Sequence, residues 1–280
     1  VTARGWEDLS EILKSYEELQ VEIGEELIGE FLQKEEIARD FAGYYRLYEK
    51  YKSDYQIQEI LDGNVISGQL KTCCDMGKKA SFEERFTVTE MLLEAVTERI
   101  SVFQKIDEKT EKLYENLKLL KIFLQEKNSV EAMEQFVASR RKALDAKICS
   151  ELLTAEEAAR EEEQIRILEE YFFQLKELHI SDVAEGIEQI GERFGNVCRL
   201  RNEKLEETKK MLEQAFSFLE ECFGEGQELL LFETGLTGDD RCSIFISQYG
   251  WPSYFKHCEL LLYSKKENEL RKECRDLLEE

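Results

Sequence analysis

Two glycines, Gly63 and Gly68, have the spacing of a phosphate-binding P-loop, so nucleotide chemistry is the first possibility that the sequence raises. In a P-loop the second glycine is followed by Lys and then Ser or Thr, which bind the phosphates and Mg²⁺. Gln69 and Leu70 occupy those two positions here, and the segment follows a predicted helix, whereas a P-loop follows a strand. We therefore expect no nucleotide cradle at residues 63–70.

Nucleophilic catalysis and metal binding both need His or Cys in defined arrangements, and the chain has only two histidines, His179 and His257. His257 precedes Cys258, but neighbours on a helix point about 100° apart and cannot form the hydrogen bond of a Cys–His pair. Together with Cys242 they also lack the spacing of a zinc site. Glutamate runs such as residues 161–163 lack the Glu-x-x-His motif of di-metal bundles and are typical of solvated helix faces. The sequence thus predicts no catalytic residue and no metal ligand.

Five tyrosines recur at helical spacing, at residues 44, 45, 48, 51 and 55, and could form a stacking platform for nucleic-acid bases. Against this, 38 basic and 61 acidic residues give a formal net charge of −23. A surface this acidic repels phosphate backbones, and the basic runs are short. We expect the tyrosines to pack between helices and the protein to have no nucleic-acid partner.

A single proline in 280 residues is the strongest indication of the fold. Average usage of about 5% would give roughly fourteen prolines, and long uninterrupted helices are the simplest way to lose them. The apolar share of 42% is enough for a real core. The sequence therefore predicts an all-α fold. No run approaches 18 apolar residues, so no membrane partner is expected.

The eight cysteines include one close pair, the adjacent Cys73 and Cys74. A disulfide scaffold is small and rich in loops, and this chain is neither. No signal peptide opens the chain. We therefore expect free thiols, several of them filling the core, in the reducing environment of the cytoplasm.

Hydrophobic periodicity divides the chain into four segments. Residues 1–62 are predicted to form a small helical domain, and residues 63–85 a linker with a short extended piece. Residues 86–222 are predicted to form a long antiparallel helical bundle or coiled coil, and residues 223–280 a compact helical subdomain. In this last segment Pro252 is predicted to lie in a turn that precedes a helix.

Signals for helix starts recur inside the long bundle. Ser129 and Ser181 are predicted N-caps, and Thr154 with Glu157 has the pattern of a capping box. Short connections between successive helices place neighbours antiparallel. These restarts favour a bundle formed within one chain, although heptad spacing alone leaves a parallel dimer open.

The apolar seam of the last long helix, residues 183–222, is interrupted at Arg201 and Thr208. Polar residues at seam positions can set the register between packed helices. They would be explained equally well if this part of the helix were exposed to solvent. The sequence leaves both explanations open.

The N-terminal residues Thr2-Ala3-Arg4-Gly5-Trp6-Glu7-Asp8-Leu9-Ser10 resemble the second sensor motif of MoxR-type AAA+ ATPases, in which (Ser/Thr)-x-Arg opens a helix of the lid. The blocks Ile37–Tyr45 and Tyr51–Tyr55 resemble the helices that follow this sensor in clostridial-type members. The resemblance covers residues 1–62, about a fifth of the chain. For residues 86–280 we identify no such resemblance, and their interpretation depends on the residues alone.

The resemblance implies that Arg4 binds the terminal phosphates of ATP and reports ATP versus ADP to the lid. A helix N-terminus already favours anions through its free amides and macrodipole. Without the resemblance, a solvated arginine at a helix start would be the better interpretation of Arg4.

The resemblance also implies what the chain lacks. The Walker A and Walker B motifs, the first sensor and the arginine finger of such ATPases lie upstream of this motif, and the chain begins at the motif. ATP and Mg²⁺ would therefore be bound by a longer parent protein, and the chain alone is not expected to hydrolyse ATP. The family acts as homo-oligomeric, chaperone-like remodellers, and its von Willebrand A-domain partners are the expected kind of partner protein.

Two other functions stay open. A free-standing acidic helical adaptor or scaffold would pair its long seam with another chain and have no catalytic activity. A helical enzyme would need a polar pocket with strongly shifted pKa values, and nothing in the sequence calls for one.

Overall fold

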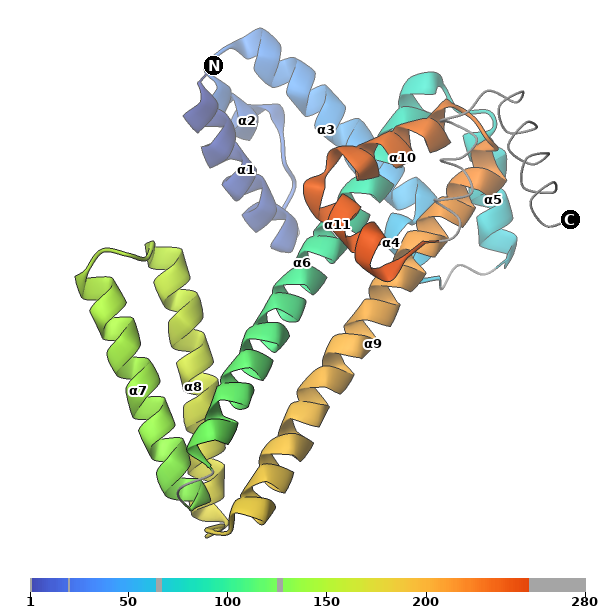
Figure 1. The fold of residues 1–280 in the computed structure, drawn as a ribbon. Coiled ribbons are helices and arrows are strands. Elements are labelled where there is room, and N and C mark those ends of the chain that lie inside the picture. The colour runs from blue at the N-terminus through green and yellow to red at the C-terminus, as the bar shows by residue number, and fades with distance from the viewer. Residues whose placement is uncertain (1, 20, 64–66, 125–127, 252–280) are drawn as a thin grey trace, which may run out of the picture. The chain divides into compact units, whose positions relative to one another are not determined.

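The computed structural model describes residues 2–19, 21–63, 67–124 and 128–251 (Figure 1). These residues form eleven α-helices and no β-strand, which confirms the predicted all-α fold. The helices are α1 (Ala3–Glu18), α2 (Glu25–Leu32), α3 (Glu35–Tyr55), α4 (Ile57–Asp62), α5 (Ser67–Gly77), α6 (Phe82–Phe123), α7 (Ser129–Cys149), α8 (Ala155–Glu177), α9 (Val183–Phe223), α10 (Gln227–Gly238) and α11 (Asp240–Tyr249). In the described ranges no helix is both long and apolar enough to cross a membrane.

The chain divides into two compact units that interleave in sequence. Among the described residues, unit 1 takes those up to Thr97, residues 210–240 and Trp251, and unit 2 takes residues 98–209 and 241–250. The units cross the boundaries that we predicted after residues 85 and 222, because α6 and α9 each contribute to both. The turn predicted at Pro252 and the rest of the C-terminal segment lie outside the described residues.

The first three helices of unit 1 share a small apolar core. Its buried members come from all three helices and are Leu9, Leu13, Ile28, Leu32 and Ala38. The helical spacing of these apolar residues brings them to one face of each helix, as the sequence predicted. The predicted third helical block, residues 35–61, is divided at Gln56, whose φ of 51° ends α3 before α4 begins.

The segment 63–85 differs from the linker that we expected. It contains α5 and the start of α6, and no extended strand occurs in its described residues. The end of α5 packs closely on the end of α9, since a Cβ added at Gly77 would lie 2.8 Å from Cε1 of Phe223. α10 also packs closely on α6, because a Cβ at Gly235 would meet the side chain of Leu93. Tertiary packing thus orders a segment whose own periodicity is weak.

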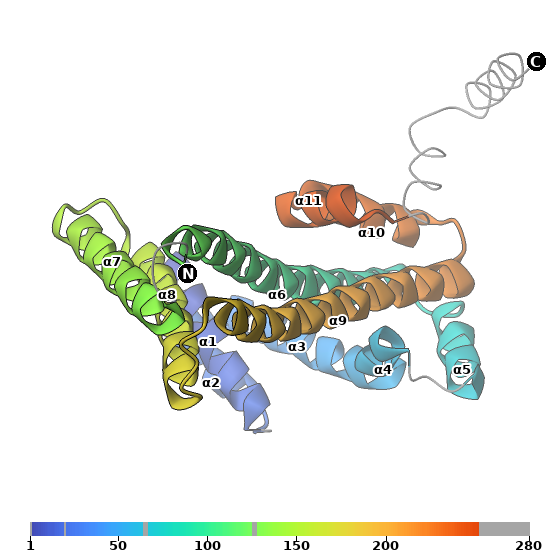
Figure 2. The same ribbon diagram turned by 60° about the horizontal axis from the view of Figure 1, so that its bottom comes forward.

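Unit 2 is built on a second apolar core that α6, α7, α8 and α9 share. α7 and α8 lie side by side as a hairpin in both views (Figures 1 and 2). The rings of Tyr114 on α6 and Phe194 on α9 stack with centroids 5.8 Å apart. Arg193 joins α9 to α8 through a 3.1 Å ion pair with Glu170. These contacts join α6, α8 and α9 within one chain.

The helix starts in unit 2 lie where the sequence placed them, but two capping residues differ from our prediction. Thr154 forms the predicted capping box with Glu157. The cap of α7 is Asn128, whose side chain accepts from the Glu131 amide at 2.9 Å. The predicted cap Ser129 instead donates to the Ile180 carbonyl at 2.6 Å and is buried.

At the start of α9 the cap is Asp182, one residue after the predicted Ser181. Its carboxylate accepts from the amides of Ala184 and Glu185 at 2.9 and 3.1 Å. The carboxylate also carries the negative charge that a helix N-terminus favours. Where several capping residues adjoin, the tertiary contacts of each one decide which is used.

Gly186 on α9 tests the close packing of unit 2. A Cβ at this residue would lie 2.5 Å from the Cβ of Ser129, which the α7 backbone holds in place. We expect Gly186→Ala to lower the free energy of unfolding by about 1–3 kcal/mol, because overpacking outweighs the gain in helix propensity. Urea unfolding followed by circular dichroism measures the difference.

Gly191 on the same helix is the matched control, because nothing lies within 4 Å of an added Cβ. Gly191→Ala should raise stability by about 0.5–1 kcal/mol through helix propensity alone. Equal effects of the two substitutions would contradict the packing described for Gly186.

Candidate functional site

The N-terminal motif, residues 2–6, begins α1 and is held by backbone capping. Thr2 has extended backbone angles, and its hydroxyl accepts from the Gly5 amide at 3.2 Å. The Thr2 carbonyl accepts from the Trp6 amide at 3.3 Å. Threonine at this position therefore defines where the helix starts.

Gly5 and Trp6 attach the same turn to the rest of unit 1. A Cβ at Gly5 would lie 2.9 Å from the carbonyl oxygen of Phe31, so the first turn of α1 and the end of α2 approach too closely for a side chain there. The Trp6 ring packs edge-on against Phe41 of α3, with centroids 5.2 Å apart. Glycine and tryptophan at these positions thus serve packing.

The Arg4 side chain is 88% exposed, and most of its neighbours in the motif are exposed as well. Its one ion pair joins Nε to Asp8 Oδ2 at 3.8 Å, one turn further along α1. Exposed pairs of this kind contribute little to stability. The motif therefore holds a cation at an exposed helix start while giving it almost no structural role.

The tyrosine ladder of α3 lies among carboxylates. Burial, together with the nearby charge of Glu94, raises the pKa of Tyr48 to about 12. The Tyr45 hydroxyl donates to Glu17 at 2.8 Å, and its pKa is also raised, first by burial and then by this bond. Such surroundings repel phosphates, so they favour the helix-packing interpretation of the tyrosines.

The seam residue Arg201 forms a polar cluster inside unit 2. Its guanidinium donates to Asp107 at 2.8 Å and to the Tyr249 hydroxyl at 2.6 Å, and that hydroxyl donates to Asp107 at 2.6 Å. Burial and the bond to Asp107 raise the pKa of Tyr249 to about 12. Arg201 also lies over the Phe103 ring. The three polar groups form hydrogen bonds with one another, so the cluster fixes how α6, α9 and α11 meet.

Thr208 is the second polar residue that interrupts the apolar seam of α9. It is buried, and its hydroxyl donates to the Lys204 carbonyl at 2.7 Å.

Glu233 on α10 is a buried acid that sequence reasoning missed. It is 2% exposed, and its Oε1 has no hydrogen-bond partner. Burial raises its pKa to about 7. Its place in an apolar helix is the only signal in the sequence, and that signal does not distinguish burial from exposure.

Among the described residues, no group of three or more His, Cys, Asp or Glu could hold a metal ion.

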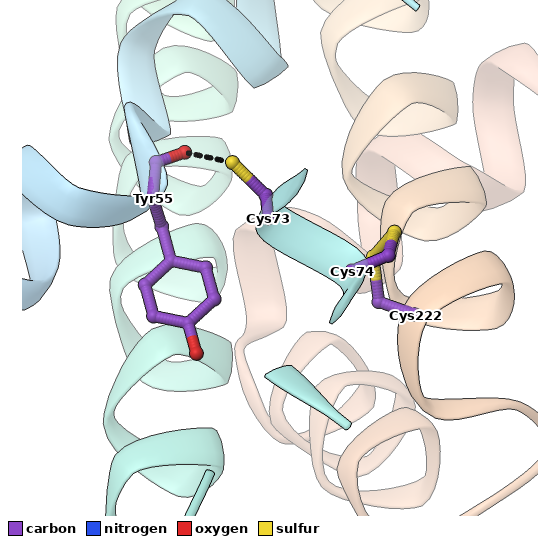
Figure 3. Close-up of a disulfide and its surroundings, with 4 residues drawn as sticks. All are labelled: Tyr55, Cys73, Cys74 and Cys222. Carbon is purple, nitrogen blue, oxygen red and sulfur yellow. Dashed lines mark hydrogen bonds between the residues drawn. A yellow bond between two sulfur atoms is a disulfide. The ribbon is translucent and has the colours of Figure 1, made fainter. Parts of the chain in front are cut away.

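The expectation that all cysteines are free thiols is wrong. Cys74 of α5 and Cys222 of α9 form a disulfide, with Cα atoms 4.4 Å apart and a sequence separation of 148 (Figure 3). Cys73, Cys149, Cys198 and Cys242 are free, and Cys258 and Cys274 lie outside the described residues. Spacing along the chain gives no signal for a pair this far apart.

Comparisons with protein-family models, with curated proteins and with solved structures found no match for this chain. The resemblance of residues 1–62 to MoxR-type ATPases therefore stays a prediction, carried by the residues quoted for it.

The different roles of Arg4 and Gly5 can be separated by stability measurements. Arg4→Ala should change the free energy of unfolding by less than about 0.5 kcal/mol, because the side chain is exposed. Gly5→Ala should lower it by about 1 kcal/mol or more, because the new methyl group meets the Phe31 carbonyl. Gly29→Ala on α2, where an added Cβ meets nothing within 4 Å, is the control for helix propensity. A stability loss for Arg4→Ala as large as for Gly5→Ala would contradict this division.

Glu233 should make stability depend on pH. Its pKa is raised on folding, so the folded protein retains the proton that the unfolded chain releases near its ordinary value of 4.5. Stability should therefore fall as the pH rises from about 4.5 to about 7, and Glu233→Gln should raise stability above that range by on the order of 2 kcal/mol.

Urea unfolding at about pH 5 and pH 8 measures this effect. Glu225→Gln removes an exposed carboxylate near the start of α10 and is the control. Identical pH dependence of the wild type and Glu233→Gln would show that this carboxyl group does not cause the effect.

Proposed function

We propose that this chain is the C-terminal lid and helical accessory region of a MoxR-like AAA+ ATPase, in which it couples the nucleotide state to a partner protein. The observation that carries the proposal is the exposure of the Arg4 side chain at a helix start whose backbone is held in place. Thr2, Gly5 and Trp6 hold the turn that bears Arg4, while the arginine itself is exposed and nearly without a structural role.

The electrostatics of this turn suit a phosphate group. The free amides and the macrodipole of α1 favour an anion at its N-terminus, and Arg4 adds a fork of donors that matches phosphate oxygens. Its 3.8 Å pair with Asp8 is exposed and weak, so a terminal phosphate can replace it.

In the parent protein the upstream core would supply the Walker motifs that bind ATP and Mg²⁺. Arg4 would contact the terminal phosphate, and loss of that phosphate would release α1 from the nucleotide. The tight contact at Gly5 and the ring pair of Trp6 with Phe41 would carry this movement to α2 and α3.

The remaining parts of the proposal concern the assembly. The parent would act as a cytoplasmic, homo-oligomeric ring with a chaperone-like remodelling activity. A von Willebrand A-domain protein is the expected partner, and the surface of this chain, at net charge −23, suits a basic or neutral face on that partner. The long helices of the accessory region would form the lever that contacts it.

The proposal is tested with the full-length parent protein. Arg4→Ala should lower kcat for ATP hydrolysis about tenfold or more, because a positioned cation at the transferring phosphate is lost. Arg4→Lys should recover part of the activity, since it keeps the charge but not the fork geometry.

Arg46→Ala removes an exposed arginine of α3 in the same unit and is the matched control. Its ATPase activity should equal that of the wild type. Full activity of Arg4→Ala would contradict the role given to this residue, and a protein without ATPase activity in any form would favour the adaptor function.

A further inference from the structure

α5 is a short helix attached through two consecutive cysteines to two different elements of unit 1. The Cys73 thiol donates to the Tyr55 carbonyl, with sulfur and oxygen 3.7 Å apart, at the end of α3. Cys74 forms the disulfide to Cys222 near the end of α9. Neighbouring side chains on a helix point about 100° apart. Figure 3 shows the sulfur of Cys73 directed to Tyr55 and that of Cys74 directed to Cys222.

The disulfide is the one covalent link between α5 and α9 in the described residues. The helix α5 has 11 residues, a length at which an isolated helix is marginal in water. Gly77 adds a close contact with Phe223, and both cysteines of the disulfide are buried, at 4% and 2% exposure. A reductant therefore reaches the sulfur atoms only when α5 moves away from α9.

We propose that the Cys74–Cys222 disulfide is a reversible redox clasp that fastens α5 to the end of α9 when oxidised and releases it when reduced. The clasp itself does not depend on the proposed nucleotide function. Its use in the cell rests on the proposed cytoplasmic location, where disulfides are mostly transient and redox-sensing.

A dithiol oxidoreductase or two molecules of glutathione supply the two electrons that reduce the disulfide. A thiolate of the reductant attacks one sulfur, the bond between Cys74 and Cys222 breaks, and a mixed disulfide forms. The second thiolate of the reductant then attacks the mixed disulfide. This forms the disulfide of the reductant and releases the cysteine that was bound in the mixed disulfide. Two electrons pass to the cysteines, and both thiolates take up protons. Glutathione disulfide reverses the sequence.

Cys73 is adjacent to the clasp but is not expected to exchange with it. Burial raises the pKa of its thiol, so the reactive thiolate is disfavoured. Its bond to the Tyr55 carbonyl holds it on the side of α3, away from Cys222.

Thiol counting tests whether the clasp forms. The full chain is equilibrated with glutathione disulfide, unfolded and alkylated without reductant, and its eight cysteines are mapped by mass spectrometry. A peptide that joins Cys74 to Cys222 is expected, and dithiothreitol should convert it to two thiols. Alkylation of both residues after the oxidising treatment would overturn the proposal.

Hydrogen exchange tests whether the clasp controls α5. In the wild-type chain, dithiothreitol should increase the exchange rates of the α5 amides about tenfold or more, while those of α7 in unit 2 stay unchanged. Equal α5 exchange in the oxidised and reduced chain would overturn the proposal, and this comparison needs no variant.

Two matched serine variants separate the neighbouring cysteines. Cys73→Ser should retain the disulfide and the response of α5 to reductant. Cys74→Ser should show fast α5 exchange with and without reductant. A response of Cys74→Ser to reductant as large as that of the wild type would assign the effect to another thiol and contradict the clasp.

Discussion

The length of α6 and α9 is the constraint on which the rest of the structure depends. They have 42 and 41 residues, and helices in water need a partner for their apolar face. In unit 2 the hairpin of α7 and α8 shares a core with both helices. In unit 1, α10 packs so closely on α6 that Gly235 leaves no room for a side chain beside Leu93. The other helices therefore help to bury the apolar faces of α6 and α9, which also contact each other in unit 2.

Polar residues in these apolar faces form hydrogen bonds with nearby groups, and these bonds make the packing specific. Arg201, Asp107 and Tyr249 bond to one another where α9, α6 and α11 meet. Breaking one member would leave the others half-buried without partners, which costs more than the cluster gains by forming. The N-terminal turn shows the opposite arrangement, because Arg4 is exposed and its only ion pair within the described part of the chain is a weak one with Asp8. The contacts of Arg201 give it a structural role, whereas the functional role of Arg4 is part of the proposal.

The helices could be predicted because hydrophobic periodicity and the capping box at Thr154 are local signals. Features that depend on distant residues could not. α5 has weak periodicity and is ordered by its contacts with α3 and α9, so the sequence alone predicts a linker there. The partner of Cys74 lies 148 residues away. For the candidate site, the motif indicated Arg4, but only the structure shows that Gly5 is required by packing.

The coding sequence immediately upstream of the Val1 codon tests the central claim most directly. If residues 1–62 are the lid of an AAA+ ATPase, an open reading frame should continue upstream and encode Walker A and Walker B motifs. An in-frame stop codon followed by a ribosome-binding site and a start codon next to Val1 would contradict the claim. The chain would then be an autonomous helical adaptor, and Arg4 would be a solvated arginine at a helix start.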